Sequence, residues 1–458
     1  MHKTKIGFIF VASLPLLIGG FSSFPLANSS EQIIDDSGTC IEEKDLTTPI
    51  ECHADFVPQD TMYSSNQAVH LGHIGNITKV WDKYQGENIR IAVIDTGIDG
   101  DHPDFYDEYG NCTIDFESAR FYAHVIAQST AGHYTIAKPV NNTWPTGTSL
   151  KYFTATSQYY FNDTFYKQHA VVGHEPIVDS KAPYHGTNVA GTIAAFAHNN
   201  TEVGCVGVAP KVQIVPIKVD FYMDAIGDAL EYIYDLNRDS IEENDIDVVN
   251  ISICGSSTDS DIGKYSRYLN SQGTIVVASA GNSNVSTPAY PAAESNIIGV
   301  GALEEGSDTS KASYSNFNEQ NATSSTATNN VEVVAPGTVY VPDYPQSYDK
   351  VSGTSFASPI VAAAAGLWKQ KNPSGTFDQF RTALHDSCVD IGDTGWDTTF
   401  GYGRLSIDEL IGTDDIVDIS SLSLQSTSSV AVNKTLTLYP TFNPTNTDCD
   451  DLRWWSEN

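Results

Sequence analysis

The sequence predicts an α/β fold with a doubly wound, mostly parallel sheet and helices on both of its faces. Continuous apolar runs recur through the middle of the chain, as in strands that are covered on both sides. Helix-like stretches separate these runs, which is the order of βαβ units. The expected strands are 90–94, 212–219, 247–253, 274–279 and 297–301, and the expected helices are 186–197, 225–237 and 261–272.

The charge balance of the chain excludes two classes of partner. Its 458 residues carry 24 Lys and Arg against 57 Asp and Glu, which gives a net charge of −33. Nucleic acid and anionic lipid surfaces select basic proteins, so neither is expected to bind. The hydrophobic fraction of 40% is enough for a large buried core.

The N-terminus predicts export. Lys3 and Lys5 precede an apolar run over 6–21, and small residues follow it, so we interpret 1–27 as a signal peptide. The run falls short of the roughly 20 apolar residues that a membrane span needs, and no later stretch reaches that length. We therefore expect a secreted or cell-surface protein, in which residues 28–69 form a short pro-segment or N-terminal arm.

Two further segments depart from the alternation of strands and helices. Residues 107–182 are rich in Tyr, Thr and Asn and show no period, which indicates an insertion at the rim of a core that spans 70–412. Residues 413–458 are rich in Ser and Thr with short alternating stretches, which is typical of strands. The 7 cysteines form no Cys-x-x-Cys pair, so neither a zinc cage nor a redox dithiol is predicted.

Three short segments carry residues suited to nucleophilic catalysis. Asp95 leaves the end of an apolar strand, His185 opens a helix of small residues, and Ser355 opens another helix. A serine hydroxyl needs a base to take its proton, and an imidazole has the right ordinary pKa for that task. A buried carboxylate would orient the imidazole and stabilise its charged form.

A fourth segment adds a hydrogen-bond donor. Asn282 follows the apolar run over 274–279, so its amide is expected at the carboxyl end of a buried strand. A side-chain amide in that place can stabilise an oxyanion, which is typically worth about 3–4 kcal/mol of barrier. The free N–H groups at the start of the Ser355 helix would add to this stabilisation.

These four segments, in the chain order Asp, His and Ser, resemble the subtilisin-like serine proteases (subtilases) over residues 70–412. The resemblance implies a subtilisin-like fold and a serine endopeptidase that cleaves peptide bonds through an acyl-enzyme. Asp95, His185 and Ser355 would be its triad, and Asn282 would be its oxyanion donor. It also implies a monomeric catalytic domain whose chemistry requires no cofactor.

The resemblance extends to the binding of a polypeptide substrate as an extended strand. The residues that it places along the substrate are Ser252, Ile253, Cys254, Gly255, Ala280 and Gly281. Cys254 stands where the family usually has glycine. Two interpretations stay open: the thiol narrows the primary pocket, or it packs as a small buried side chain.

Two further expectations follow from resemblance. Asp104 and a loop that contains Asn200 match a structural Ca²⁺ site of many subtilases, and such oxygen donors suit a hard cation. The segment 413–458 resembles the start of a bacterial immunoglobulin-like domain of group 2. It is incomplete, since such a sandwich needs about 100 residues.

Two alternative functions remain. One is a catalytically inactive subtilase scaffold that acts as a surface adhesin or binding module, although all three triad residues are present. The other keeps the triad but uses it for peptide ligation or for selective processing of a pro-protein. A metalloprotease is excluded from the prediction because no His-Glu-x-x-His pattern occurs.

Overall fold

The structure is a computed structural model that describes residues 33–34, 40–41, 58, 60–107, 109–115, 118–122, 184–197, 204–219, 222–238, 245–319, 331–343, 346–412, 421–425 and 439–443. The predicted signal peptide 1–27 and Asn200 lie outside these residues, and so do most of the arm, the insertion and the tail. Within the described residues, no helix has the length and apolarity needed to cross a membrane.

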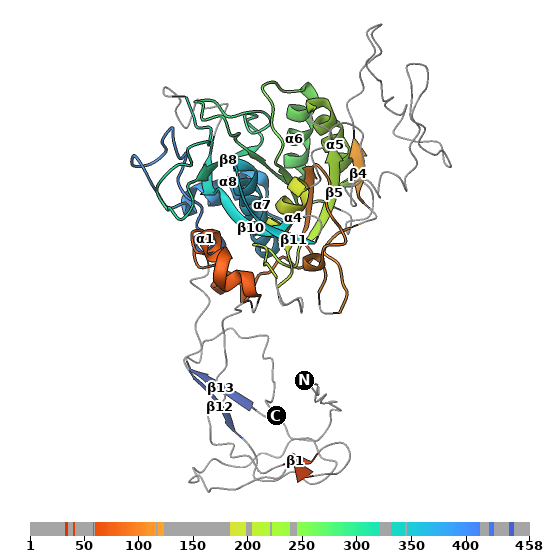
Figure 1. Ribbon diagram of the computed structural model, residues 1–458, viewed down its shortest axis with the longest axis vertical. Helices are drawn as coiled ribbons and strands as arrows, with labels where there is room; N and C mark the ends of the chain where they lie inside the picture. The colour runs from red at the N-terminus through yellow and green to blue at the C-terminus, as the bar shows by residue number, and fades with distance from the viewer. Residues whose placement is uncertain are drawn as a thin grey trace, which may run out of the picture. The chain divides into compact units, whose positions relative to one another are not determined.

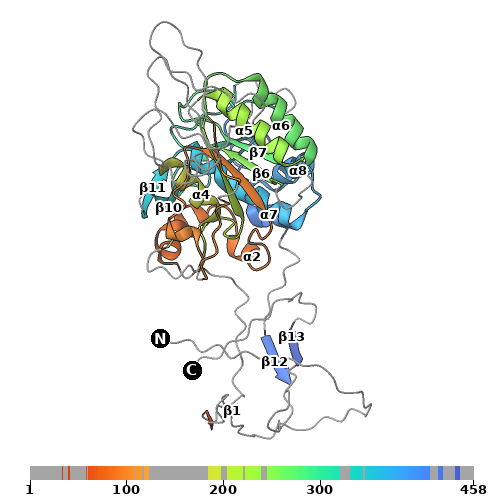
Figure 2. The same ribbon diagram turned by 90° about the vertical axis from the view of Figure 1, so that its right-hand side faces the viewer.

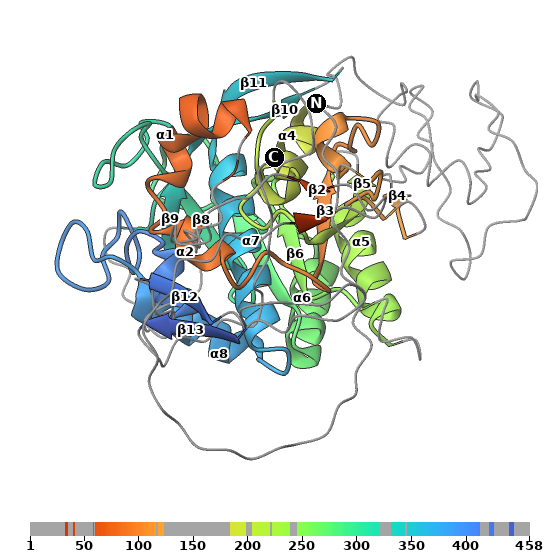
Figure 3. The same ribbon diagram turned by 90° about the horizontal axis from the view of Figure 1, so that it is seen from below.

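Seven parallel strands in the described part of the chain form one sheet, in the order β4-β5-β3-β6-β7-β8-β9. Figure 3 shows labels of this sheet in the same sequence from right to left. The strands are β3 (Arg90–Asp95), β4 (Arg120–Tyr122), β5 (Gln213–Val219), β6 (Val248–Ile251), β7 (Ile275–Ser279), β8 (Ile298–Leu303) and β9 (Val333–Pro336). Because β3 lies between β5 and β6, the strand order reverses beside it, which is where such sheets place their sites.

Both faces of the sheet are covered, which confirms the doubly wound α/β prediction. Successive side chains of a strand point to opposite faces. Ile91 and Val93 of β3 belong to one apolar cluster, and Ala92 and Ile94 belong to a second. The first contains residues of α4 and α7 and the second contains residues of α5 and α6, on opposite sides of the strands in Figure 2. These helices are α4 (Tyr184–Ala194), α5 (Met223–Leu236), α6 (Ser260–Gln272) and α7 (Thr354–Lys371).

Shorter elements complete the described chain. An antiparallel hairpin of β10 and β11 runs beside α4 (Figure 1) and ends just before α7. The shorter elements are η1 (Tyr63–Gln67), α1 (Ala68–Leu71), α2 (Ile77–Trp81), η2 (Pro103–Phe105), β10 (Thr338–Asp343), β11 (Ser347–Ser352), α8 (Phe377–Ser387) and α9 (Ile407–Ile411).

The chain divides into two compact units, and one of them, Asp55–Thr413, contains the sheet. Residues near the end of the predicted arm pack into this unit: Gln67 is fully buried, and its amide group donates to the Val206 carbonyl oxygen (2.9 Å) and accepts from the Val206 N–H (2.8 Å). The boundary at residue 70 stays a prediction.

In the other unit, the residues that the structure describes form two strand pairs. In it, β1 (Ile33–Ile34) pairs with β2 (Cys40–Ile41), and β12 (Ser421–Gln425) pairs with β13 (Tyr439–Asn443), both antiparallel. The second pair agrees with the strand character predicted for the tail. Its immunoglobulin-like nature stays a prediction.

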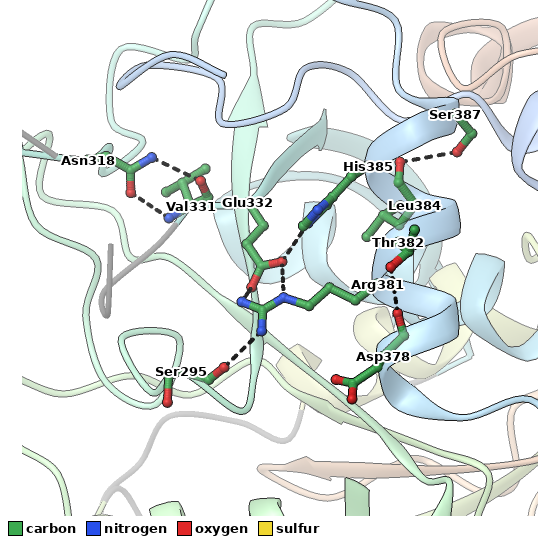
Figure 4. A network of polar contacts seen from close by, with 10 residues as sticks. All are labelled: Ser295, Asn318, Val331, Glu332, Asp378, Arg381, Thr382, Leu384, His385 and Ser387. Atoms are coloured by element: carbon green, nitrogen blue, oxygen red, sulfur yellow. Dashed lines mark hydrogen bonds and ion pairs between the residues drawn. The ribbon is translucent and has the colours of Figure 1, made fainter. Parts of the chain in front are cut away.

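A buried carboxylate fixes α8 against the sheet. Glu332 precedes β9 and is 1% exposed, while Arg381 and His385 reach it from α8, one turn apart (Figure 4). Arg381 Nε and His385 Nε2 each lie 2.8 Å from Glu332 Oε2, and Arg381 Nη2 contacts Oε1. The His385 ring also stacks on Tyr402 with 3.6 Å between centroids. The carboxylate therefore has charged or polar partners on both oxygens.

We expect Glu332→Gln to destabilise the protein by about 3 kcal/mol, because it leaves the Arg381 guanidinium without its counter-charge in a largely buried place. Urea unfolding monitored by tryptophan fluorescence measures this loss, in a Ser355→Ala background that prevents self-digestion. The matched control is Glu87→Gln, whose partner Lys211 is 35% exposed. Exposed pairs contribute less than about 1 kcal/mol, and equal losses at the two sites would contradict the prediction.

Candidate active site

Asp95 and His185 meet at the carboxyl end of β3. Asp95 is the last residue of that strand and is 1% exposed, while His185 lies in the first turn of α4. His185 Nδ1 lies 2.8 Å from Asp95 Oδ1, and the imidazole side chain is 35% exposed. One ring nitrogen is thus held by a buried carboxylate, and the other is left for chemistry at the surface.

The turn after Asp95 brings the two residues together. The Thr96 N–H donates to Asp95 Oδ1 (2.7 Å), and the Thr96 hydroxyl accepts from the Gly186 N–H (3.0 Å). A Cβ at Gly186 would stand 2.1 Å from the Gly97 carbonyl oxygen, so only glycine allows α4 to approach this closely. The sequence supplies both conditions, a hydroxyl after Asp95 and a glycine after His185.

The Asp95 carboxylate changes the acid strength of His185. Burial opposes the charged imidazolium and acts to lower the pKa of His185, but the charge and hydrogen bond of Asp95 outweigh it. The net result is a pKa of His185 above its ordinary value of 6.5. A base of this strength is well matched to taking a proton near neutral pH.

Ser355 is the second residue of α7 and is 8% exposed. Its N–H is one of the first four of the helix, which have no partner inside the helix. Its hydroxyl donates to the Ser252 carbonyl oxygen (3.2 Å), and no hydrogen bond joins it to His185 in the described structure. His185 nevertheless lies beside this turn, with its ring centroid 5.4 Å from that of Phe356. Rotation about the Ser355 Cα–Cβ bond would turn the hydroxyl away from Ser252.

Asn282 follows β7 and is oriented by the residue before Ser355. Both the N–H and the hydroxyl of Thr354 donate to Asn282 Oδ1, each at 2.9 Å. Because Oδ1 is occupied in this way, the amide nitrogen is the end left to donate. It faces the turn before α7, where a Cβ built on Gly353 would stand 3.3 Å from it. This arrangement presents an N–H donor next to Ser355.

The segment predicted to bind substrate begins directly beside Ser355. Ser252 follows β6 and is 4% exposed, and Gly255 pairs with Tyr290 through two backbone hydrogen bonds (2.8 and 3.0 Å). Ile253 is buried in the core, so only its backbone can face a substrate. Cys254 is exposed and unbonded to another cysteine, so it does not pack as a small buried side chain. Ala280 and Gly281 are buried at the end of β7.

Asp104 lies in η2. Its side chain is fully buried, with Oδ1 accepting from the Tyr348 hydroxyl (2.8 Å) and Oδ2 from the Cys205 N–H (2.9 Å). Across the residues that the structure describes, no group of three or more His, Cys, Asp and Glu could hold a metal ion. Because Asn200 lies outside the described residues, the calcium site stays a prediction.

Several residues of this region were not singled out from the sequence. Thr96 and Thr354 orient Asp95 and Asn282, and Asn316 shapes the turn after β7 by accepting from the Ser283 N–H (2.9 Å) and donating to the Ala280 carbonyl oxygen (3.0 Å). The two threonines are adjacent to predicted site residues, which was a usable signal. Asn316 is 34 positions from Asn282 in sequence, and no local pattern marks it.

Known proteins resemble this chain in sequence and in fold. The model of the subtilase family matches residues 86–403. The chain is 35% identical to subtilisin BL of Lederbergia lenta over 46% of its own length and 72% of that protein. It is 29% identical to subtilisin E of Bacillus subtilis, over 70% of the chain and 64% of that protein. A solved structure titled S41 psychrophilic protease shares the fold, with a TM-score of 0.50 and 23% identity over 70% of this chain and 92% of that one.

Proposed function

The chain belongs to the subtilase family of serine-type endopeptidases, and from this premise we propose that Asp95, His185 and Ser355 are its catalytic triad. The observation that carries the proposal is the 2.8 Å contact between the buried Asp95 carboxylate and His185 Nδ1, beside a serine at a helix N-terminus. The substrates of a serine endopeptidase are polypeptides.

The proposed reaction proceeds in two stages. His185 takes the proton of the Ser355 hydroxyl as the oxygen attacks the carbonyl carbon of the scissile peptide bond. The resulting imidazolium, stabilised by Asp95, then gives this proton to the leaving amine, and an acyl-enzyme remains on Ser355. A water molecule, deprotonated by His185, hydrolyses this ester and restores the free serine.

Negative charge develops on the carbonyl oxygen in both stages. We propose that the Asn282 amide nitrogen and the Ser355 N–H donate to this oxygen. The supporting observations are the fixed orientation of the amide by Thr354 and the position of Ser355 in the first turn of α7. Such donors are effective because they are already oriented before charge appears.

We expect Asn282→Leu to lower kcat about 10²- to 10³-fold with little change in KM, because the lost hydrogen bond forms mainly in the transition state. Hydrolysis of a chromogenic peptide measures both constants. The control is Asn372→Leu, at the far end of α7, whose amide donates to the Trp368 carbonyl oxygen (3.0 Å). A full kcat in Asn282→Leu would contradict the assigned role.

The substrate is proposed to bind as an extended strand along residues 252–255, with Ala280 and Gly281 at the opposite side of the bound chain. The exposure of Cys254 supports a thiol that limits the size of the primary pocket. Cleavage of a peptide library by the wild type and by Cys254→Gly would test this, since the variant is expected to accept larger side chains.

The test of the triad is labelling with a fluorophosphonate, which reacts only with an activated serine. Mass mapping should place the label on the peptide that contains Ser355. Absence of labelling in folded protein would contradict the proposed function and support the alternative, an inactive subtilase scaffold that serves as an adhesin.

Three further proposals concern the whole chain. Secretion, with removal of 1–27, would be tested by N-terminal sequencing of the extracellular protein. A structural Ca²⁺ near Asp104 and Asn200 would be supported by a rise of Tm on adding Ca²⁺ to EDTA-treated protein. The immunoglobulin-like character of 413–458 would be tested by solving the structure of that region in the intact chain.

A further inference from the structure

The carbonyl oxygen of Ser355 lacks its ordinary helical partner. In an α-helix this oxygen would accept from the N–H of the residue four positions later. That residue is Pro359, which lies inside α7 and has no N–H. The ring of a proline inside a helix also crowds the carbonyl four residues before it, which here is the same carbonyl. The residue proposed as nucleophile is therefore the one whose carbonyl oxygen loses its helical hydrogen bond to the proline.

A side chain from another element replaces the missing bond. The Ser252 hydroxyl donates to the Ser355 carbonyl oxygen at 2.8 Å, and the Ser355 hydroxyl in turn donates to the Ser252 carbonyl oxygen at 3.2 Å. These two reciprocal bonds join the start of α7 to the segment that is proposed to bind substrate. The position of Ser355 is thus tied to that of Ser252.

Two more buried groups hold Ser252 in place. The Asn250 amide nitrogen donates to the Ser252 hydroxyl (3.0 Å), and the Ser358 hydroxyl donates to the Asn250 amide oxygen (2.7 Å). Asn250 and Ser358 are 0% exposed. The orientation of the amide is constrained. If Asn250 were flipped, its amide oxygen would accept a hydrogen bond from the Ser252 hydroxyl, and the Ser355 carbonyl would be left without a donor.

We propose that Ser358, Asn250 and Ser252 form a positioning relay, which holds Ser355 against the substrate-binding segment because Pro359 has removed the helical bond that would otherwise do so. The relay begins on α7, crosses to the end of β6 and returns to α7 one turn earlier. None of its three side chains reacts with substrate. The inference rests on the proposed role of Ser355 as nucleophile.

The test is a double-mutant cycle between Ser252→Ala and Pro359→Ala in the full chain. We expect Ser252→Ala to lower kcat roughly 10- to 100-fold with little change in KM, because a displaced nucleophile reacts slowly. Pro359→Ala restores an N–H to the Ser355 carbonyl, so in that background Ser252→Ala should cost roughly threefold or less. Asn250→Ala, which leaves Ser252 in place, should lower kcat in the same direction.

A matched control is available at the opposite end of the sheet. Before β7, the Asn237 amide donates to the Thr274 hydroxyl (2.9 Å), which donates to the Ile246 carbonyl oxygen (3.0 Å). This is the same sequence of amide, hydroxyl and carbonyl groups, but far from Ser355 along β7. Thr274→Val should lower the stability without lowering kcat, which separates positioning from general loss of packing.

The outcomes test the relay and the proposed function separately. The relay is supported if Ser252→Ala lowers kcat and Pro359→Ala reduces that loss. The pKa of the acid limb in the pH profile should then stay at its wild-type value. An unchanged kcat in Ser252→Ala and Asn250→Ala, in an enzyme that Ser355→Ala inactivates, overturns the relay alone. A loss that Pro359→Ala leaves undiminished also overturns it. Wild-type protein with no Ser355-dependent turnover overturns the proposed function and the relay's role together.

Discussion

Replacing Ser355 with alanine is expected to lower kcat about 10⁶-fold and to abolish fluorophosphonate labelling. The hydroxyl is the only group proposed to form a covalent bond with the substrate, so no neighbouring side chain can take its place. Water attack assisted by the Asn282 amide would account for the residual rate, about 10³- to 10⁴-fold above the uncatalysed reaction. Hydrolysis of a chromogenic peptide over several days measures a rate of this size.

Substrate binding should survive the same change. Ser355→Ala removes the bond to the Ser252 carbonyl oxygen (3.2 Å), but the Ser252 hydroxyl still donates to the carbonyl oxygen of residue 355 (2.8 Å). The backbone pairing of Gly255 with Tyr290 (2.8 Å) also stays, so KM or the Kd of a peptide should stay within about threefold. The control is Ser387→Ala on α8, whose hydroxyl donates to the Leu384 carbonyl oxygen (3.1 Å). Comparable activity of Ser355→Ala and Ser387→Ala would remove Ser355 from the mechanism.

The sheet and its helices could be predicted because their pattern is local. The run at 90–94 became β3, and each expected helix became α4, α5 or α6 with ends shifted by up to three residues. The strand β4 was missed because it lies in the segment 107–182, which was expected to be an insertion, and β9 was missed because no expected helix between it and β8 completes a βαβ unit. Their place in the sheet is decided by pairing with β5 and β8, which the sequence does not state.

The site followed the same division between local and distant information. Asp95, His185, Asn282 and Ser355 stand next to glycine, small residues or strand ends, so short segments mark them. The supporting groups do not: Asn250 and Ser358 are 108 positions apart, and only the folded chain brings them within 2.7 Å. Pro359 is visible in the sequence, and so is its missing N–H. The group that donates to the Ser355 carbonyl oxygen instead, the Ser252 hydroxyl, is known only from the folded chain.

Asp95→Asn is expected to lower kcat about 10⁴-fold, because a neutral side chain cannot stabilise the imidazolium that forms on His185. The geometry adds a second penalty. Asp95 Oδ1 accepts from both Thr96 and His185, while Oδ2 is buried without a hydrogen bond. An asparagine must therefore either bury its NH₂ group unpaired or turn it toward the Thr96 N–H and His185. In the second orientation the amide also fixes the imidazole in the tautomer that cannot accept the Ser355 proton.

The pH profile distinguishes this role from a loss of structure. His185 must be neutral to act as a base, so kcat/KM of the wild type should rise with pH through a pKa above 6.5. Without the carboxylate, only burial acts on the imidazole and lowers its pKa, so the acid limb of Asp95→Asn should move to lower pH. Asp247→Asn is the control: that carboxylate accepts from the Arg90 N–H (3.0 Å) at the amino end of β3, so its loss should leave the limb in place. If Asp95→Asn loses activity but the acid limb of its kcat/KM profile keeps the wild-type pKa, Asp95 does not set the basicity of His185.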